Sequence, residues 1–309
     1  MKIGFIYAGQ GSQYVGMGKE FYETSPACRE LLDGVSLDFD YKQMMFEGDM
    51  TALSQTSHTQ PCMVAVAMMA TLLLKEKGIT PAYTCGLSLG EYSALACANV
   101  FTPAQAIEIV RKRGLAMEKA AKGIDSKMCA IIGMDRETLQ KTIDALDPAL
   151  GYVAIANYNC PGQLVVGGEE RAVDALSNAA LENGARRAIP LNTSGPFHTK
   201  LLKAASEELH EYFKHVTFGD MQIPVIFNST GKELDASVTI AQMLEKQVMS
   251  PVYFEDSIRY MIAHGVDTII EIGPGKVLSG FVRKIDRSIK TYHVEDNATL
   301  AKVVEELGE

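Results

Sequence analysis

The chain has 309 residues, of which 47% are hydrophobic and 22% charged, an ordinary composition for a globular protein large enough to bury a sizeable core. Its net charge of −9 argues against nucleic acid as a general partner. The first residues read as a core strand rather than a signal peptide, and no apolar run is long enough to span a bilayer. Six cysteines without a C-x-x-C pair predict reduced, buried thiols in a cytoplasmic protein and no metal site.

The first part of the chain alternates between strands and helices. A strand at the N-terminus runs into a glycine loop at residues 9–13. A helix is predicted to open at Pro61, since proline is tolerated in a first helical turn, and to end near Gly78. The next predicted elements are a short strand at 82–85, a helix at 89–98 and a helix at 103–121.

The pattern changes between residues 128 and 191. The predicted order there is β-α-β-β-α-β, with strands at 128–134, 153–156, 163–167 and 187–191 and helices at 136–146 and 169–183. This is the split ferredoxin-like arrangement. Beyond it, α/β alternation returns with a helix from about Pro196, strands at 225–228 and 268–272, and a helix after residues 273–275.

These elements predict a discontinuous fold. We expect an α/β-hydrolase-like parallel-sheet domain formed by residues 1–126 and 195–309. A ferredoxin-like small domain, residues 127–194, is inserted into it.

The segment Gly86-Leu87-Ser88-Leu89-Gly90 is the most informative part of the chain. Glycines on both sides of the serine are needed where a strand turns sharply into a helix and leaves no room for side chains. The turn exposes the Ser88 hydroxyl beside the backbone N–H of Leu89 at the start of the helix. This geometry suits a nucleophile that attacks a carbonyl group, and we favour it over a glycine-flanked turn with a capping serine.

His198 is the predicted base for Ser88, because it stands where a loop enters a helix whose apolar stripe begins at Leu202. The positive end of that helix would disfavour an imidazolium ion and keep the base neutral. The other histidines occupy polar or isolated positions and are interpreted as surface or structural residues. No acidic residue in a recognisable motif completes a triad, so the residues themselves leave its third member open.

The glycine loop at residues 9–13 does not bind a dinucleotide in the usual way, because Tyr14 stands where the third glycine of that fingerprint belongs. The glycine–lysine pairs of the chain also lack the Ser or Thr that follows in a Walker motif. Such a loop can instead offer a backbone N–H to an oxyanion, the second donor that an acyl-transfer site requires.

Arg113 lies against the apolar stripe of the helix predicted at 103–121, between Val110 and Met117. A guanidinium directed inward needs an anion, and a substrate carboxylate could bind it through two parallel hydrogen bonds. The alternative, equally open, is an arginine whose stem covers apolar surface while its head reaches water. Arg111 and Lys112 point elsewhere and are predicted to be solvated.

Eight motifs follow one another over nearly the whole chain. They are Gly9-Gln10-Gly11-Ser12-Gln13, Thr59-Gln60-Pro61, GLSLGEYSA at 86–94, Lys112-Arg113-Gly114, Asn159-Cys160-Pro161-Gly162-Gln163, Phe197-His198, Gln247-Val248-Met249-Ser250-Pro251-Val252 and Glu271-Ile272-Gly273-Pro274-Gly275-Lys276. Together they resemble the malonyl-CoA:acyl carrier protein transacylases of fatty-acid synthesis. One such motif would be a weak signal, but the ordered set is highly specific.

The resemblance implies a role for each matching catalytic position. Ser88 would be the nucleophile and His198 its base, with the oxyanion hole formed by the backbone N–H groups of Gln10 and Leu89. The main-chain carbonyl of Gln247 would orient His198, which explains the missing acid.

The resemblance also implies how substrate is held. Arg113 would bind the malonyl carboxylate, Gln60 and Asn159 would line the site, and Phe197 matches a malonyl-selective pattern. The family usually has histidine immediately before the nucleophile, where this chain has Leu87, so no role is carried over to that neighbour.

The implied reaction transfers a malonyl group from malonyl-CoA to the pantetheine thiol of acyl carrier protein, through a serine acyl-enzyme and without a metal or cofactor. The first alternative is a serine thioesterase or other hydrolase, which would leave Arg113 unexplained. A second is a stand-alone acyltransferase of a polyketide synthase, and a third is an inactive scaffold that docks carrier protein, against which the intact Ser88 and His198 argue.

An acidic carrier protein would need a local basic patch on this acidic chain. Candidates are Arg186 and Arg187 ahead of the last small-domain strand, with Arg283 and Lys284 on the helix after residues 273–275. The competing interpretation is four ordinary solvated charges.

Overall fold

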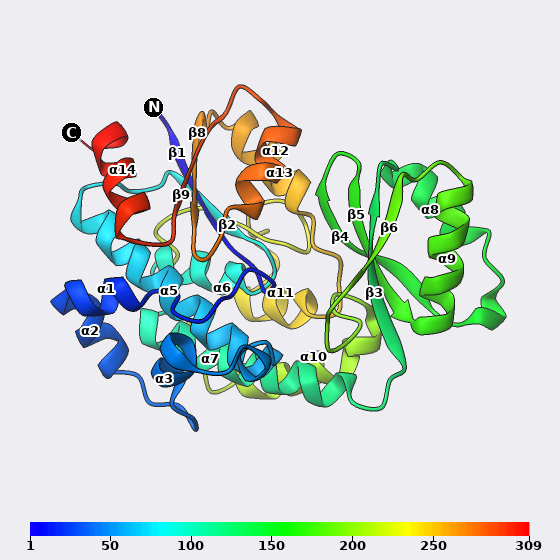
Figure 1. Cartoon of the computed structure of the whole chain (residues 1–309), viewed down its shortest axis with the longest axis horizontal. Coiled ribbons are helices and arrows are strands. Elements are labelled where there is room, and N and C mark those ends of the chain that lie inside the picture. Colours follow the sequence, from blue (N-terminus) through cyan, green and yellow to red (C-terminus); the bar gives the residue numbers. More distant parts are fainter. Residues whose placement is uncertain (309) are drawn as a thin grey trace.

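The computed structural model describes residues 1–308 and is built around a five-stranded sheet (Figure 1). Its strands are, in spatial order, β7 (Val225–Ile226), β2 (Tyr83–Gly86), β1 (Ile3–Tyr7), β8 (Thr268–Ile272) and β9 (Lys290–Val294). Every neighbouring pair is parallel. The loops that follow β1 and β2 therefore leave the same edge of the sheet, where α/β folds bind their ligands.

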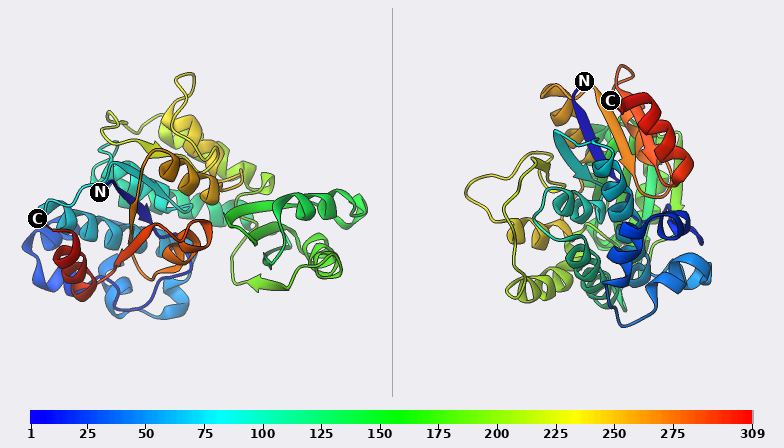
Figure 2. Two further views of the ribbon diagram at one scale, coloured as in Figure 1. Left: turned by 90° about the horizontal axis from the view of Figure 1, so that it is seen from above. Right: turned by 90° about the vertical axis from the view of Figure 1, so that its left-hand side faces the viewer.

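A second sheet of four antiparallel strands belongs to the predicted insert. It contains β3 (Ser126–Ile132), β4 (Val153–Cys160), β5 (Gln163–Glu169) and β6 (Arg187–Leu191), in the order β4-β5-β3-β6. With α8 (Arg136–Asp144) and α9 (Glu170–Glu182) it has the ferredoxin-like connectivity, which confirms the predicted fold class. Figure 2 shows this part projecting from the layers around the large sheet. The boundaries at residues 127 and 194 stay a prediction.

The other helices pack around the parallel sheet. They are α1 (Lys19–Thr24), α2 (Pro26–Asp33), α3 (Tyr41–Glu47), α4 (Met50–Leu53), α5 (Thr56–Glu76), α6 (Gly90–Cys97), α7 (Pro103–Ala121), α10 (Lys203–Phe213), α11 (Ile240–Gln247), α12 (Phe254–Ala263), α13 (Val277–Ile285) and α14 (Asn297–Leu307), with short 3₁₀ turns at Pro148–Leu150 and Lys200–Leu202. Alternate strand residues divide the core, since Phe5 and Tyr7 join the cluster around α5 and α7 while Ile6 joins that of α12 and α13. All six cysteines are buried and free, as predicted.

Helix α5 is the central core helix of the large domain. Within residues 1–308 it is the one helix long and apolar enough to cross a membrane, but 89% of that stretch is buried inside the fold. It packs against α7 along its length. Its apolar surface is therefore used for the core, as expected for the run of residues 63–74.

The predicted start of this helix at Pro61 is wrong, because α5 begins at Thr56 and Pro61 lies inside it. Proline has no N–H, so the carbonyl of Ser57 loses its partner one turn earlier in the helix. The guanidinium of Arg111 replaces that partner, and its Nη1 donates to the Ser57 carbonyl over 2.8 Å. A long-range hydrogen bond thus repairs the defect that the sequence prediction took for a helix end.

Arg111 is accordingly not solvated, contrary to the prediction, whereas Lys112 is exposed. The Nε and Nη2 of Arg111 each donate to Asp38 over 2.8 Å, a bidentate pair. The pair lowers the pKa of Asp38 to about 2, chiefly through the hydrogen bond from Arg111. The prediction failed because nothing local in the sequence reveals an unpaired carbonyl on another helix.

Helix α7 holds the first turn of α5 at close range. A Cβ at Gly114 would lie 2.7 Å from the Cα of Ser57, so only glycine allows this approach. The Ser57 N–H also donates to Oε1 of Glu118 over 2.8 Å. These contacts fix the position of Gln60 on α5 relative to Arg113 on α7.

Replacing Arg111 by alanine should destabilise the protein by about 2–4 kcal/mol, because it leaves the buried Ser57 carbonyl without a donor and removes an ion pair. The neighbouring Lys112→Ala serves as the matched control and should change stability by less than about 0.5 kcal/mol. Urea unfolding of both variants measures the difference. Equal stabilities would contradict the role assigned to Arg111.

Candidate active site

Ser88 lies in a sharp turn between β2 and α6, in the predicted order of strand, elbow and helix. Its φ is 55°, an unusual left-handed conformation for a residue other than glycine. A Cβ at Gly86 would lie 2.0 Å from the carbonyl carbon of Gly90, and one at Gly90 would lie 2.3 Å from the carbonyl oxygen of Tyr7. The two flanking glycines are therefore required by backbone packed on both sides of the turn.

The side chain of His198 meets Ser88 across 110 residues of sequence, with Nε2 2.7 Å from the Ser88 Oγ. Its Nδ1 is 2.9 Å from the main-chain carbonyl of Gln247. Because a carbonyl can only accept, Nδ1 carries the proton and Nε2 is left to accept from the serine hydroxyl. The Gln247 carbonyl thus occupies the place of the acid in a triad.

The neutral state of His198 has two causes that the sequence did not predict. The residue lies in a turn with a φ of 60°, just before the 3₁₀ turn at Lys200–Leu202 that leads into α10, which agrees with the predicted place in or just before the first helical turn. Burial, and next the positive charge of Arg113, lower the pKa of His198 to about 4. Desolvation and a neighbouring cation thus keep the imidazole of His198 unprotonated.

Arg113 is fully buried directly beside Ser88. Its Nη2 donates to the Ser88 Oγ over 3.1 Å and to Oε1 of Gln247 over 2.9 Å. Its Nε and Nη1 are buried and have no acceptor within residues 1–308. The guanidinium also lies 5.3 Å from the centre of the Tyr92 ring. The alternative of a head group in water is thus wrong, and unused N–H donors await an anion.

The two N–H groups expected to form an oxyanion hole lie on the loops that follow β1 and β2. Gln10 and Leu89 line the same cavity as Ser88, and their backbone N–H groups donate no hydrogen bond within residues 1–308. A Cβ at Gly9 would lie 2.8 Å from the carbonyl of Leu87, so glycine permits the close approach of the two loops. Both N–H groups remain free to bind a ligand oxygen.

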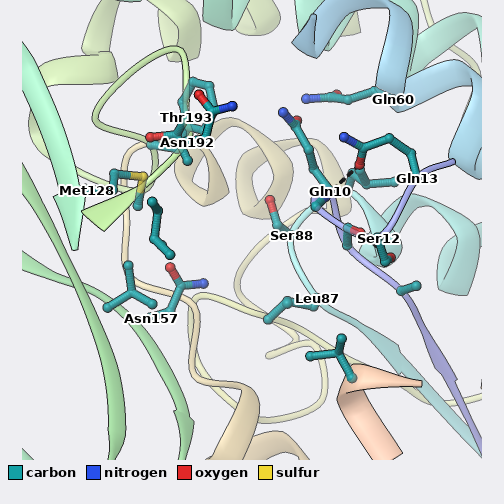
Figure 3. A pocket seen from close by; sticks show the side chains of 18 of the residues that line it. Gln10, Ser12, Gln13, Gln60, Leu87, Ser88, Met128, Asn157, Asn192 and Thr193 are labelled. Atoms are coloured by element: carbon teal, nitrogen blue, oxygen red, sulfur yellow. Dashed lines mark hydrogen bonds between the residues drawn. The ribbon is translucent and has the colours of Figure 1, made fainter. Parts of the chain in front are cut away.

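The cavity at this site has a volume of about 900 Å³ and is walled by both domains. In Figure 3, Ser88 lies between Gln10 and Gln60 of the large domain and Met128 and Asn157 of the small one. A substrate bound in this cavity would therefore contact residues that lie far apart in the sequence.

The residues expected to line the site do so. Gln60, Asn159 and Phe197 are all buried and border the cavity. The Oε1 of Gln60 and the Oδ1 of Asn159 are buried without a hydrogen-bond donor within residues 1–308. Leu87, in place of the usual histidine, packs against the cluster of α12 and α13 and donates its N–H to the Tyr7 carbonyl over 3.0 Å. The hydrogen bond from the Leu87 N–H is made by the backbone, so it does not depend on which side chain stands at this position.

The four basic residues predicted for docking are all exposed. Lys284 reaches the small domain, where its Nζ donates to Oε1 of Gln163 over 3.1 Å. The stem of Arg186 covers Gly133, whose N–H donates to the carbonyl of Gly162, the neighbour of Gln163. Lys284 and Arg186 therefore flank one edge of the small domain. Arg283 instead donates to the hydroxyl of Thr291 on β9, and Arg187 begins β6.

Asn228 and Glu91 also contact the elbow, and neither was predicted as a site residue. The side chain of Asn228 forms hydrogen bonds with the backbone of Ser88 and Gly86, and the carboxyl group of Glu91 accepts a hydrogen bond from the N–H of Asn228. Glu91 lies within the motif at 86–94, and Asn228 lies two residues beyond the end of β7, but no spacing rule links the two positions. Only their hydrogen bonds in the folded structure identify these two residues.

Comparison with known proteins places these features in a family. The acyl transferase domain matches residues 4–307. The malonyl CoA-acyl carrier protein transacylase of Bacillus subtilis (strain 168) is 44% identical over 310 residues, covering 100% of this chain and 98% of that protein.

Two solved structures resemble the whole chain. The malonyl CoA-acyl carrier protein transacylase of Clostridium perfringens Atcc 13124 matches with a TM-score of 0.95 at 38% identity, over 99% of this chain and 97% of that one. A malonyl-transacylase solved in complex with its type II PKS acyl-carrier protein matches with a TM-score of 0.94 at 33% identity, over 99% and 100% of the two chains.

The α/β fold with its ferredoxin-like insert and a domain match over nearly every residue define an acyltransferase. The full-length relatives narrow that class, and the chain belongs to the malonyl-CoA:acyl carrier protein transacylase family. The resemblance inferred from the ordered motifs is confirmed.

The lowered pKa of His198 predicts an unusual pH profile. Acylation kcat/KM should hold its value below pH 6.5 and fall only as the pH approaches about 4, where the free base becomes protonated. Arg113→Ala removes the second cause but not burial, so the pKa of His198 should rise and stay below 6.5. NMR titration of the His198 ring in both proteins measures this.

The lowered pKa of His198 also makes the stability of the fold depend on pH. The unfolded chain binds a proton at His198 more readily than the fold does, so this group lowers the free energy of unfolding as pH falls from 6.5 towards about 4. A His198 ring that titrates near 6.5 in the wild-type protein would contradict the assignment.

Proposed function

We propose that this chain transfers malonyl groups from malonyl-CoA to the pantetheine thiol of acyl carrier protein, to supply fatty-acid synthesis, and that Ser88 and His198 perform the chemistry. One observation carries the proposal: a buried guanidinium with free N–H donors lies 3.1 Å from a serine hydroxyl that is bonded to a neutral histidine. A nucleophile and a carboxylate-binding group are thus combined in one cavity.

The first half-reaction forms an ester. The Ser88 Oγ attacks the thioester carbonyl of malonyl-CoA while its proton passes to Nε2 of His198. The resulting oxyanion accepts hydrogen bonds from the N–H groups of Gln10 and Leu89. The carbon–sulfur bond then breaks, and the proton on His198 leaves with the CoA thiol.

The second half-reaction reverses these steps with a new thiol. The pantetheine thiol of the carrier protein gives its proton to His198 and attacks the malonyl ester. Collapse of the oxyanion breaks the bond to Oγ, and Ser88 recovers its proton from His198. Side chains and backbone groups of the protein account for every step, so we propose no resident cofactor or metal, and malonyl-CoA enters as a substrate.

Arg113 accounts for the proposed preference for a malonyl group. A malonyl carboxylate supplies the anion that its Nε and Nη1 lack, whereas an acetyl group presents only a methyl and leaves them unpaired. A simple thioesterase has no use for such a group beside its nucleophile. An inactive scaffold would have no need to keep the Ser88–His198 hydrogen bond at 2.7 Å.

The partner proposal is supported by a named relative and by charge. A similar malonyl-transacylase has been solved with a type II PKS acyl-carrier protein. Here the exposed Arg186 and Lys284 flank one edge of the small domain, beside Gln163 at the cavity wall. An acidic partner docked there would present its pantetheine arm towards Ser88.

Mixing the protein with malonyl-CoA should add one malonyl group to Ser88, detected by intact-protein mass spectrometry. Ser88→Ala should fold and form no adduct, because no other hydroxyl is activated there. His198→Ala should lower the transfer rate by about 10²–10⁴-fold through loss of the base. An adduct retained by Ser88→Ala would reject the proposed nucleophile.

Arg113→Ala should weaken malonyl transfer strongly and narrow the preference over acetyl. A charge-assisted pair is worth about 1.5–3 kcal/mol, or roughly one to two orders of magnitude in kcat/KM. Arg113→Lys should restore only part of the preference, because it keeps the charge and loses the planar fork. The measurement is kcat/KM for malonyl-CoA over that for acetyl-CoA. The same ratio in wild type and Arg113→Ala would assign selectivity elsewhere.

Charge reversal at Arg186 and Lys284 should raise the KM for carrier protein and spare acylation by malonyl-CoA, with a defect that diminishes at high salt. The same pattern, in weaker form, is expected for Arg187 and Arg283. Lys302→Glu on α14, an exposed charge on a distant helix, serves as the control (Figure 1). Carrier-protein kinetics like those of the control would remove this patch from the proposal.

A further inference from the structure

The backbone that leads into Ser88 is held by one side chain, that of Asn228. Its Oδ1 accepts a hydrogen bond from the N–H of Ser88 over 2.7 Å, and its Nδ2 donates to the carbonyl of Gly86 over 2.6 Å. Asn228 is completely buried and lies just beyond the end of β7. A single side-chain amide therefore bridges the backbone from Gly86 to the N–H of Ser88.

The turn needs such support, because the left-handed backbone of Ser88 is sparsely populated unless the surroundings enforce it. On its other side, the Ser88 carbonyl accepts from Nε2 of Gln247 over 2.9 Å. Side-chain amides thus bind both backbone polar groups of Ser88. The direction of the hydroxyl follows from the backbone that they fix.

Only an amide of this length fits the two contacts that Asn228 makes. The Ser88 N–H requires an acceptor and the Gly86 carbonyl requires a donor. An aspartate would place an acceptor against the Gly86 carbonyl and bury a charge. An alanine would leave both backbone groups without their partner.

Asn228 is itself held by the helix that follows the elbow. Its N–H donates to Oε2 of Glu91, which is buried in the first turn of α6. Its carbonyl accepts from the N–H of Tyr253 over 2.8 Å. The contacts form a closed loop from Ser88 through α6 to Glu91, on to Asn228 and back to Ser88.

We propose that Asn228, anchored by Glu91, is a positioning residue that aims the Ser88 hydroxyl at Nε2 of His198. It acts through Ser88 and does not contribute to the recognition of the malonyl carboxylate. The inference rests on the proposed role of Ser88 as the nucleophile.

The protonation of Glu91 supports this arrangement. Burial raises its pKa to about 8, partly offset by the hydrogen bond from Asn228 and the charge of Arg113. The group needed at neutral pH is therefore an oxygen acceptor rather than a negative charge. Glutamine can supply the same acceptor, whereas leucine cannot.

The test measures single-turnover acyl-enzyme formation with malonyl-CoA by quenched-flow mass spectrometry. A small fluorophosphonate, which labels activated serines and needs no carboxylate recognition, is used in parallel. The variants are Asn228→Ala, Asn228→Asp, Glu91→Gln and Glu91→Leu. Leu32→Ala, which removes a buried side chain of α2 away from the cavity, is the control for lost stability.

Asn228→Ala should form acyl-enzyme about 10²-fold more slowly, the effect of a misplaced reactive group, with an unchanged half-saturating malonyl-CoA concentration. Asn228→Asp should be similarly slow. Glu91→Gln should stay within about threefold of wild type, and Glu91→Leu should be slowed by about tenfold or more. Fluorophosphonate labelling should follow the same order, and Leu32→Ala should react like wild type.

The inference is overturned if folded Asn228→Ala reacts at the wild-type rate with both reagents, or if only its half-saturating concentration changes. Should Asn228→Ala fail to fold, the Glu91 pair decides, because equal rates for Gln and Leu would reject the anchor. A wild-type protein that neither reagent modifies at Ser88 would instead reject the proposed nucleophile. The two failures are thereby distinguished.

Discussion

Arg113 is a permanent cation held in the core, and no carboxylate is hydrogen-bonded to it within the part of the chain that the structure describes. It is fully buried and uses Nη2 for contacts to Ser88 and Gln247, while two of its nitrogens have no acceptor. A charge buried in this way costs free energy unless something else completes its coordination. The site is organised around that unmet requirement.

This charge influences both His198 and Gln247. It lowers the pKa of His198 further than burial alone does, so the base is ready to accept a proton. Arg113 also donates a hydrogen bond to the side chain of Gln247. The main-chain carbonyl of Gln247 orients His198, and its side-chain Nε2 donates to the Ser88 carbonyl. In the proposed mechanism, substrate selection and nucleophile activation therefore share one hydrogen-bond network.

The fold brings this network together from distant segments. Ser88 follows a central strand, Arg113 comes from α7, and His198 and Gln247 come from the chain after the small domain. The small domain adds a wall to the cavity and one edge with exposed basic residues. In the proposed docking, a carrier protein is recognised on this insert, and the parallel sheet that carries Ser88 is unaltered.

Features with a local signature could be predicted from the sequence. The elbow at Ser88 follows from two glycines and a strand-to-helix transition, the ferredoxin-like insert from the order of its elements, and α7 from its apolar stripe. The pairing of Ser88 with His198 followed from chemistry. The spacing of residues in α7 indicated that Arg113 points towards the core, but it did not show whether the guanidinium is buried or reaches water.

Features that depend on a distant partner could not be predicted. The start of α5 was misplaced because Arg111 supplies the donor that Pro61 lacks. The neutral state of His198 was predicted from a helix end alone, and the contributions of burial and Arg113 were missed. Asn228 was missed since its hydrogen bonds to the elbow cross about 140 residues of sequence.

The central claim is that the malonyl carboxylate completes the coordination of Arg113 while the acyl carbon meets the nucleophile. A crystal structure of Ser88→Ala with bound malonyl-CoA tests it most directly. The account predicts carboxylate oxygens within hydrogen-bond distance of Nε and Nη1 of Arg113, and the thioester oxygen beside the N–H groups of Gln10 and Leu89. A malonyl-CoA complex whose carboxylate lies in solvent, with Nε and Nη1 still unpaired, would contradict it.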